Sequence, residues 1–88
     1  MRIVGNIPHP DIRITVFHMN EKYMVKLEAG PMEQVFKFDQ EKYPGFDAIK
    51  KLVDEVFISH ALKRFNEMFL EMRSAEERMK DEGLKIKD

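Results

Sequence analysis

The chain has 88 residues, of which 43% are hydrophobic and 35% charged, and its formal net charge is −1. This composition excludes a disordered chain, which would have fewer aliphatic residues and a larger net charge. The balance of 15 basic against 16 acidic residues excludes an overall basic surface for nucleic acid and leaves only a local patch. A single domain of this length buries only about 60–65% of its unfolded surface, so a second copy would add to its stability.

Cysteine is absent from the sequence. Disulfides, thiolate nucleophiles and cysteine-ligated metal centres are therefore excluded. The first ten residues hold no apolar run after a basic start, and no segment approaches 18 uninterrupted apolar residues. We therefore expect neither a signal peptide nor a membrane span, and we expect a cytoplasmic location.

Residues 11–39 alternate between apolar and polar side chains, which is the pattern of half-buried strands. A turn at Asn20 and Glu21 places Val16 opposite Val25, so that the hydrophobic pattern and the hairpin register agree. The side chains expected on the inner face of this sheet are Ile12, Ile14, Val16, Val25, Leu27, Phe36 and Phe38.

Two further features complete the predicted sheet. Gly30 and Pro31 form the second turn, because proline cannot donate a hydrogen bond to a strand ladder. The segment from Arg2 to Val4 is a candidate for a short additional strand that Gly5 and Asn6 would end, and its pairing stays open. The sequence thus predicts an antiparallel β-meander of three to four strands.

A helical region follows the sheet. Tyr43, Pro44 and Gly45 end the strands, and no further glycine or proline occurs before Gly83, so we predict a helix from Phe46 to Glu82. The predicted organisation is one α+β domain, 1–88, made of the meander 1–43, the helical region 44–82 and a frayed tail 83–88.

The apolar residues of the helical region lie on two helix faces. At 100° per residue these faces are about 140° apart, and the change comes near Ile58. Either one long helix serves two different partners, or the chain bends near Ser59 and His60. A capping-box pattern that starts at Ser74 permits a second restart of the helix.

The predicted helix is longer than the predicted sheet. A continuous helix over residues 46–82 would measure about 55 Å, against about 27 Å for strands of eight residues. Apolar side chains would then project beyond the sheet, where a second subunit is the simplest cover. The oligomer interface expected from this pattern consists of Ile58, Leu62, Phe65, Met68, Phe69 and Met72. Alternatively, a bend would fold the second half back over the same sheet and give a monomer.

No residue cluster specifies a reaction. The histidines His9, His18 and His60 share no metal-ligand spacing, and Glu67 and Glu71 have nearby basic side chains as ordinary ion-pair partners. The two serines, Ser59 and Ser74, lie in the predicted helix and are not part of a G-x-S-x-G motif of the kind that holds a catalytic serine. The glycines are isolated in the sequence and form no glycine-rich phosphate-binding loop. We therefore expect no catalytic residue, no metal and no cofactor.

The sequence favours a small, non-enzymatic, homo-oligomeric interaction module, in which the partner is a second copy or another protein. The alternative is a single-stranded nucleic-acid-binding protein that uses the outer face of the sheet. On this face, cationic side chains would attract the nucleic-acid backbone and an aromatic ring would stack on the bases. These side chains are Arg13, Phe17, Lys26 and Lys37.

Overall fold

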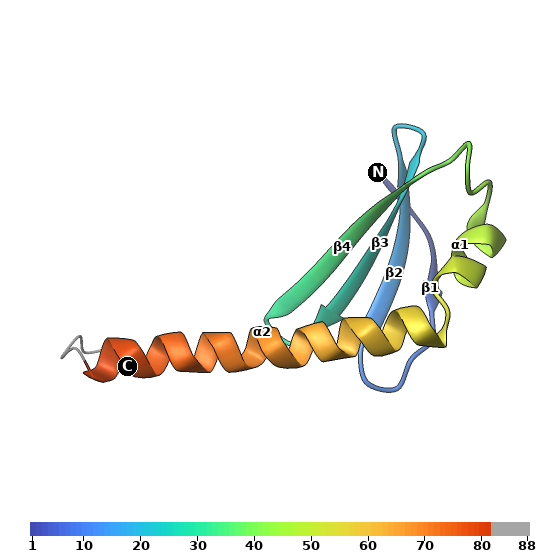
Figure 1. Cartoon of the computed structure of the whole chain (residues 1–88). Coiled ribbons are helices and arrows are strands. Elements are labelled where there is room, and N and C mark those ends of the chain that lie inside the picture. The colour runs from blue at the N-terminus through green and yellow to red at the C-terminus, as the bar shows by residue number, and fades with distance from the viewer. Residues whose placement is uncertain (82–88) are drawn as a thin grey trace.

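The computed structural model describes residues 1–81 and has an α+β fold, in which a four-stranded antiparallel sheet packs against a long C-terminal helix (Figure 1). The strand order is β1-β2-β3-β4. The elements are β1 (Arg2–Ile7), β2 (Arg13–Met19), β3 (Lys22–Ala29), β4 (Met32–Asp39), α1 (Phe46–Leu52) and α2 (Glu55–Asp81). The predicted fold class is confirmed, whereas Glu82, the stop at Gly83 and the tail 83–88 lie outside the described residues. Neither described helix has the length and apolar character needed to cross a membrane.

The two predicted hairpins are present, and the first has the predicted register. Asn20 and Glu21 have φ values of 48° and 61°, as the two-residue turn between twisted antiparallel strands requires. Val16 lies opposite Val25. The second turn uses Gly30 at φ 59°, where glycine avoids the strain that a side chain would cause.

Strand β1 is longer than predicted and pairs antiparallel with β2. The prediction that the strand ends at Gly5 and Asn6 is wrong, because β1 continues through both residues after a register shift between Ile3 and Gly5. A Cβ atom at Gly5 would lie 2.7 Å from the Phe46 ring. Glycine at this position therefore allows the first residue of α1 to pack directly on the strand.

The helical region is interrupted at Val53 and Asp54, where the sequence predicted no break. Val53 has a non-helical ψ of 71°, and its N–H donates to the C=O of Ile49, which ends α1. The Oδ1 atom of Asp54 accepts a hydrogen bond from the Phe57 N–H at 2.9 Å. This side chain caps the first turn of α2 and so fixes where the second helix begins.

Helix α2 is continuous over its 27 described residues, so of the two alternatives the long helix is present and the bend at Ser59 and His60 is not. The hydroxyl of Ser59 donates to the C=O of Val56 at 2.9 Å, a bond that a helix accommodates. The restart that the capping-box pattern at Ser74 permits does not occur either. There the hydroxyl accepts a hydrogen bond from Arg78 Nη1 at 2.8 Å, one turn further along the same helix.

The core lies between the inner face of the sheet and both helices. Its buried apolar side chains are Ile12, Ile14, Val16, Val25, Leu27, Ile49, Val53, Ile58, Ala61 and Phe65. Helix α1 contacts β1 and α2 contacts β4, so the helical region crosses the sheet from one edge to the other. The change of helix face near Ile58 therefore results from the break at residues 53–54, since each helix turns its own apolar face to the same sheet.

Candidate interaction surface

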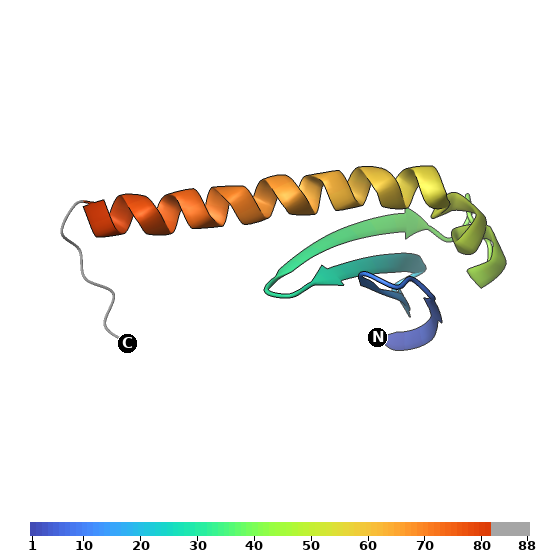
Figure 2. The same ribbon diagram turned by 90° about the horizontal axis from the view of Figure 1, so that it is seen from below.

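Helix α2 extends well beyond the sheet. Its 27 residues span about 40 Å at 1.5 Å per residue, whereas a sheet of four strands spaced about 4.8 Å apart is only about 15–20 Å wide. Figures 1 and 2 show that the C-terminal half of α2 runs past β4 and beyond the end of the sheet. This half of the helix has no covering layer from the described part of the chain.

The six predicted interface residues divide between the core and the exposed surface. Ile58 and Phe65 are buried at 8% and 4% exposure. Leu62 and Met68 are half-buried and pack against the core. Phe69 and Met72 are 44% and 41% exposed. The first four residues thus cover the chain's own sheet, and only the last two lie on a surface open to a partner.

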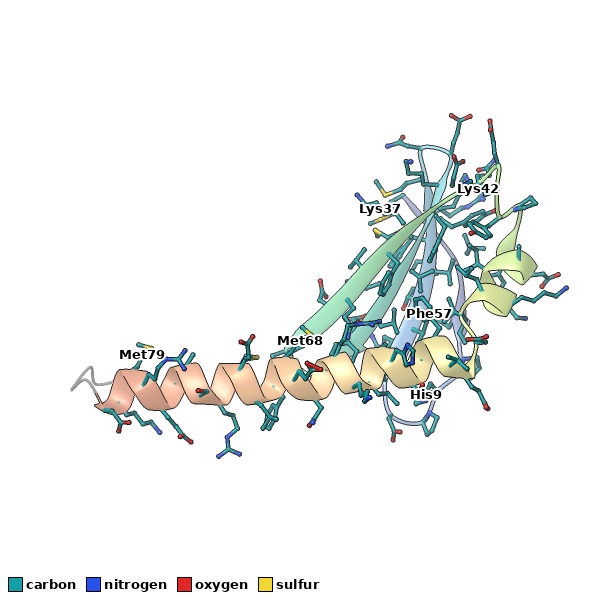
Figure 3. All side chains as sticks on the ribbon, in the orientation of Figure 1. His9, Lys37, Lys42, Phe57, Met68 and Met79 are labelled. Atoms are coloured by element: carbon teal, nitrogen blue, oxygen red, sulfur yellow. The ribbon has the colours of Figure 1, made fainter. Side chains whose placement is uncertain are left out.

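Three exposed apolar residues of α2, Phe69, Met72 and Met79, continue the face that packs on the sheet. At 100° per residue, Phe69, Met72 and Met79 all lie within about 40° of Phe65 around the helix axis. Figure 3 shows that Met68 and Met79 leave α2 on the same side, the side on which the sheet lies. We call Phe69, Met72 and Met79 the distal stripe. Met79, which is 43% exposed, was absent from the predicted interface, although its seven-residue spacing from Met72 follows the same face.

Two polar contacts fix the crossing of α2 over β4. The Nε2 atom of Gln34 donates to the C=O of Ala61 at 2.9 Å, and Arg64 Nε donates to Gln34 Oε1 at 2.9 Å. The Arg64 guanidinium also lies 5.7 Å from the centre of the Phe36 ring. An open groove runs beside this crossing. Its lining residues are Gln34, Arg64, Glu67, Met68, Leu70 and Glu71.

Phe69, the first residue of the distal stripe, has a local contact with a cation. The Arg73 guanidinium lies 5.8 Å from the centre of the Phe69 ring, a distance at which a cation is attracted to an aromatic face. The ring is thus exposed on one side and held by a cation on another. Aromatic residues and arginine are both enriched in protein interfaces.

The four residues of the alternative nucleic-acid surface share the outer face of the sheet, as their strand positions require. Lys26 forms an ion pair with Glu33 at 3.5 Å. Phe17 is half-buried and lies opposite Ile3 on one side and Met24 on the other. One cation is therefore neutralised, and the aromatic ring belongs to an apolar row rather than to an isolated stacking platform.

The histidines lie in three separate environments. His9 accepts the N–H of Asp11 at 3.1 Å in the loop after β1, and the His18 ring hydrogen-bonds to the side chain of Gln40. His60 is exposed on α2. Within residues 1–81, no group of three or more histidine, aspartate or glutamate side chains is arranged to hold a metal ion.

Comparison of the chain with protein-family models, with curated proteins and with solved structures finds no match in any of the three.

Proposed function

We propose that this protein is a small, non-enzymatic, cytoplasmic interaction module that assembles with a second copy of itself through the C-terminal half of α2. The observation that carries the proposal is the distal stripe. It continues the core-facing side of α2 past the sheet with side chains that are 41–44% exposed. Monomeric proteins seldom leave large apolar side chains grouped on one exposed face.

The composition of the stripe also supports a protein partner. Two of its three residues are methionines, whose flexible thioethers adapt to protein surfaces, and the third is an aromatic residue of the kind enriched in interfaces. A chain of this size gains more from association than a larger domain would, because its own core is small.

Single-stranded nucleic-acid binding on the outer face is the competing hypothesis. The ion pair between Lys26 and Glu33 and the overall charge of −1 favour self-assembly over it. Retention on a single-stranded oligonucleotide column that falls steeply with salt would support nucleic-acid binding instead.

The proposal is tested by the solution mass of two matched variants. Phe69→Asp places a charge in the stripe and should convert the assembly to a folded monomer, because burying an unpaired carboxylate is costly. Val56→Asp is the control. Val56 is 62% exposed and lies on the opposite side of α2 from Phe65, so this variant should keep the mass of the wild type. If both variants keep that mass, the stripe is not the interface.

A further inference from the structure

The two edges of the sheet differ in how they are protected. Strand β1 has six residues and a register shift at Gly5, against which the Phe46 ring packs. Strand β4 has eight residues paired with β3 without any shift, and it contains no glycine or proline. Among residues 1–81, β3 is its only strand partner. An uninterrupted free edge of this kind is a template for another strand.

The free backbone groups of β4 can be identified from the ladder. The N–H of Gln40 donates to the C=O of Glu21 at 3.1 Å, and directly bonded pairs alternate with unbonded pairs along antiparallel strands. Counting from this bond, the opposed residues Lys26 and Val35 are an unbonded pair. The N–H and C=O of Val35 therefore point away from β3 to the free edge, as do those of Glu33 and Lys37.

The side chains at these three positions are self-complementary. Glu33, Val35 and Lys37 all lie on the outer face and are exposed. If a second β4 pairs antiparallel about Val35, each Val35 meets its counterpart, and each Glu33 lies opposite Lys37 of the other copy. Charges are a common device that keeps edge strands apart, but this order brings opposite charges together across a two-fold axis.

We infer that the second copy docks on the β4 edge, so that two β4 strands pair antiparallel about Val35 and the sheets join into one of eight strands. This inference rests on the proposed self-assembly and specifies its geometry. The two-fold axis then places both α2 helices on the same face of the joined sheet. Because α2 runs past β4 (Figure 1), its distal stripe comes over the half of the sheet that the second copy supplies.

Charge reversal tests the register. Glu33→Lys alone sets two lysines against each other across the axis, and Lys37→Glu alone sets two glutamates against each other, so each variant should raise the dissociation constant roughly tenfold. An equimolar mixture of the two variants pairs opposite charges at both positions when the strands come from different variants. It should form a heterodimer that is tighter than either homodimer.

The mixture also controls for folding effects. Glu33→Lys removes the ion pair with Lys26, and this intramolecular loss is not restored by mixing with Lys37→Glu. Recovery in the mixture therefore reports only the contact between chains. If the wild type is dimeric and the mixture stays as weak as the single variants, the β4 register is wrong while self-assembly stands. A monomeric wild type overturns both.

A cross-link provides a second readout. Because the chain has no cysteine, Val35→Cys introduces a single thiol, opposite its symmetry mate in a bonded pair. The Cα separation of such pairs, about 5.5 Å, suits a disulfide. Mild oxidation should convert most of this variant to a covalent dimer, whereas Val56→Cys should stay monomeric in denaturing electrophoresis without reducing agent. Equal cross-linking of the two variants would overturn the proposed pairing.

Discussion

The carboxylate of Asp54 accepts the backbone N–H of Phe57 at 2.9 Å, and the C=O of Asp54 accepts the N–H of Ile58 at 3.0 Å. Together these bonds start α2 immediately after the break that ends α1. The start position sets the rotation of α2, and so determines that Ile58 and Phe65 face the sheet. The same rotation carries the distal stripe onto the side of the helix that a partner would cover.

Replacing Asp54 by alanine should lower the free energy of unfolding by about 1 kcal/mol, because the Phe57 N–H loses its acceptor at the helix start. Asp54→Ser keeps a capping oxygen and should retain most of the stability. Urea denaturation followed by circular dichroism measures both variants. Equal stability of the alanine variant and the wild type would show that the cap does not stabilise α2.

Ser59→Ala should change the free energy of unfolding by less than about 0.5 kcal/mol, because Ser59 lies inside a continuous helix and is exposed. The same urea titration measures it. A loss of stability as large as that of Asp54→Ala would mean that the hydrogen bond from the Ser59 hydroxyl to the Val56 C=O stabilises the start of α2.

Gly5→Ala should destabilise the fold by about 1–3 kcal/mol, since its Cβ atom would lie 2.7 Å from the Phe46 ring. The smaller side chain in Phe46→Leu should relieve this overlap. A double-mutant cycle by chemical denaturation therefore predicts a smaller cost for Gly5→Ala in the Phe46→Leu background. Additive effects would show that the overlap does not determine the choice of glycine.

Phe65 and Phe69 should respond differently to truncation. Phe65→Ala should lower the free energy of unfolding by about 3–5 kcal/mol at any protein concentration, because this ring is 4% exposed in the core. Phe69→Ala should instead weaken the dependence of Tm on protein concentration, which association causes. Thermal scans over a range of concentrations measure this difference. A concentration-independent loss for Phe69→Ala would place that ring in the core.

The sheet could be predicted in detail because its signals are local and agree with one another. Alternation indicated which side chains of β2 and β3 face inward, and Asn20 with Glu21 set a two-residue turn that matches that alternation. The continuation of β1 through Gly5 was missed, because it depends on a contact with Phe46, 41 positions later in the sequence.

The helix break was missed because no glycine or proline marks it. The signals that were present are an aspartate suited to capping at Asp54, an acidic first turn at Glu55, and the change of apolar face itself. The face changes a few residues after the break, since Val56 is exposed and Phe57 is only half-buried. Because of this offset, the pattern left a bend at Ser59 and His60 open as an alternative to one long helix.

The exposed apolar side chains of α2 could be predicted only in part. The helical spacing identifies the apolar side of α2, but the point at which the sheet stops covering it depends on where α2 crosses β4. The contacts of Gln34 with Ala61 and Arg64 fix that crossing, and they join residues that are about 30 positions apart. The sequence pattern therefore could not separate Phe65, in the core, from Phe69, on the surface.

The most direct test of the central claim is the mass of the wild-type chain measured by sedimentation equilibrium over a wide range of concentrations. Self-assembly through the distal stripe predicts a mass that rises with concentration to twice that of the chain. A mass equal to that of a single chain at every concentration would contradict it.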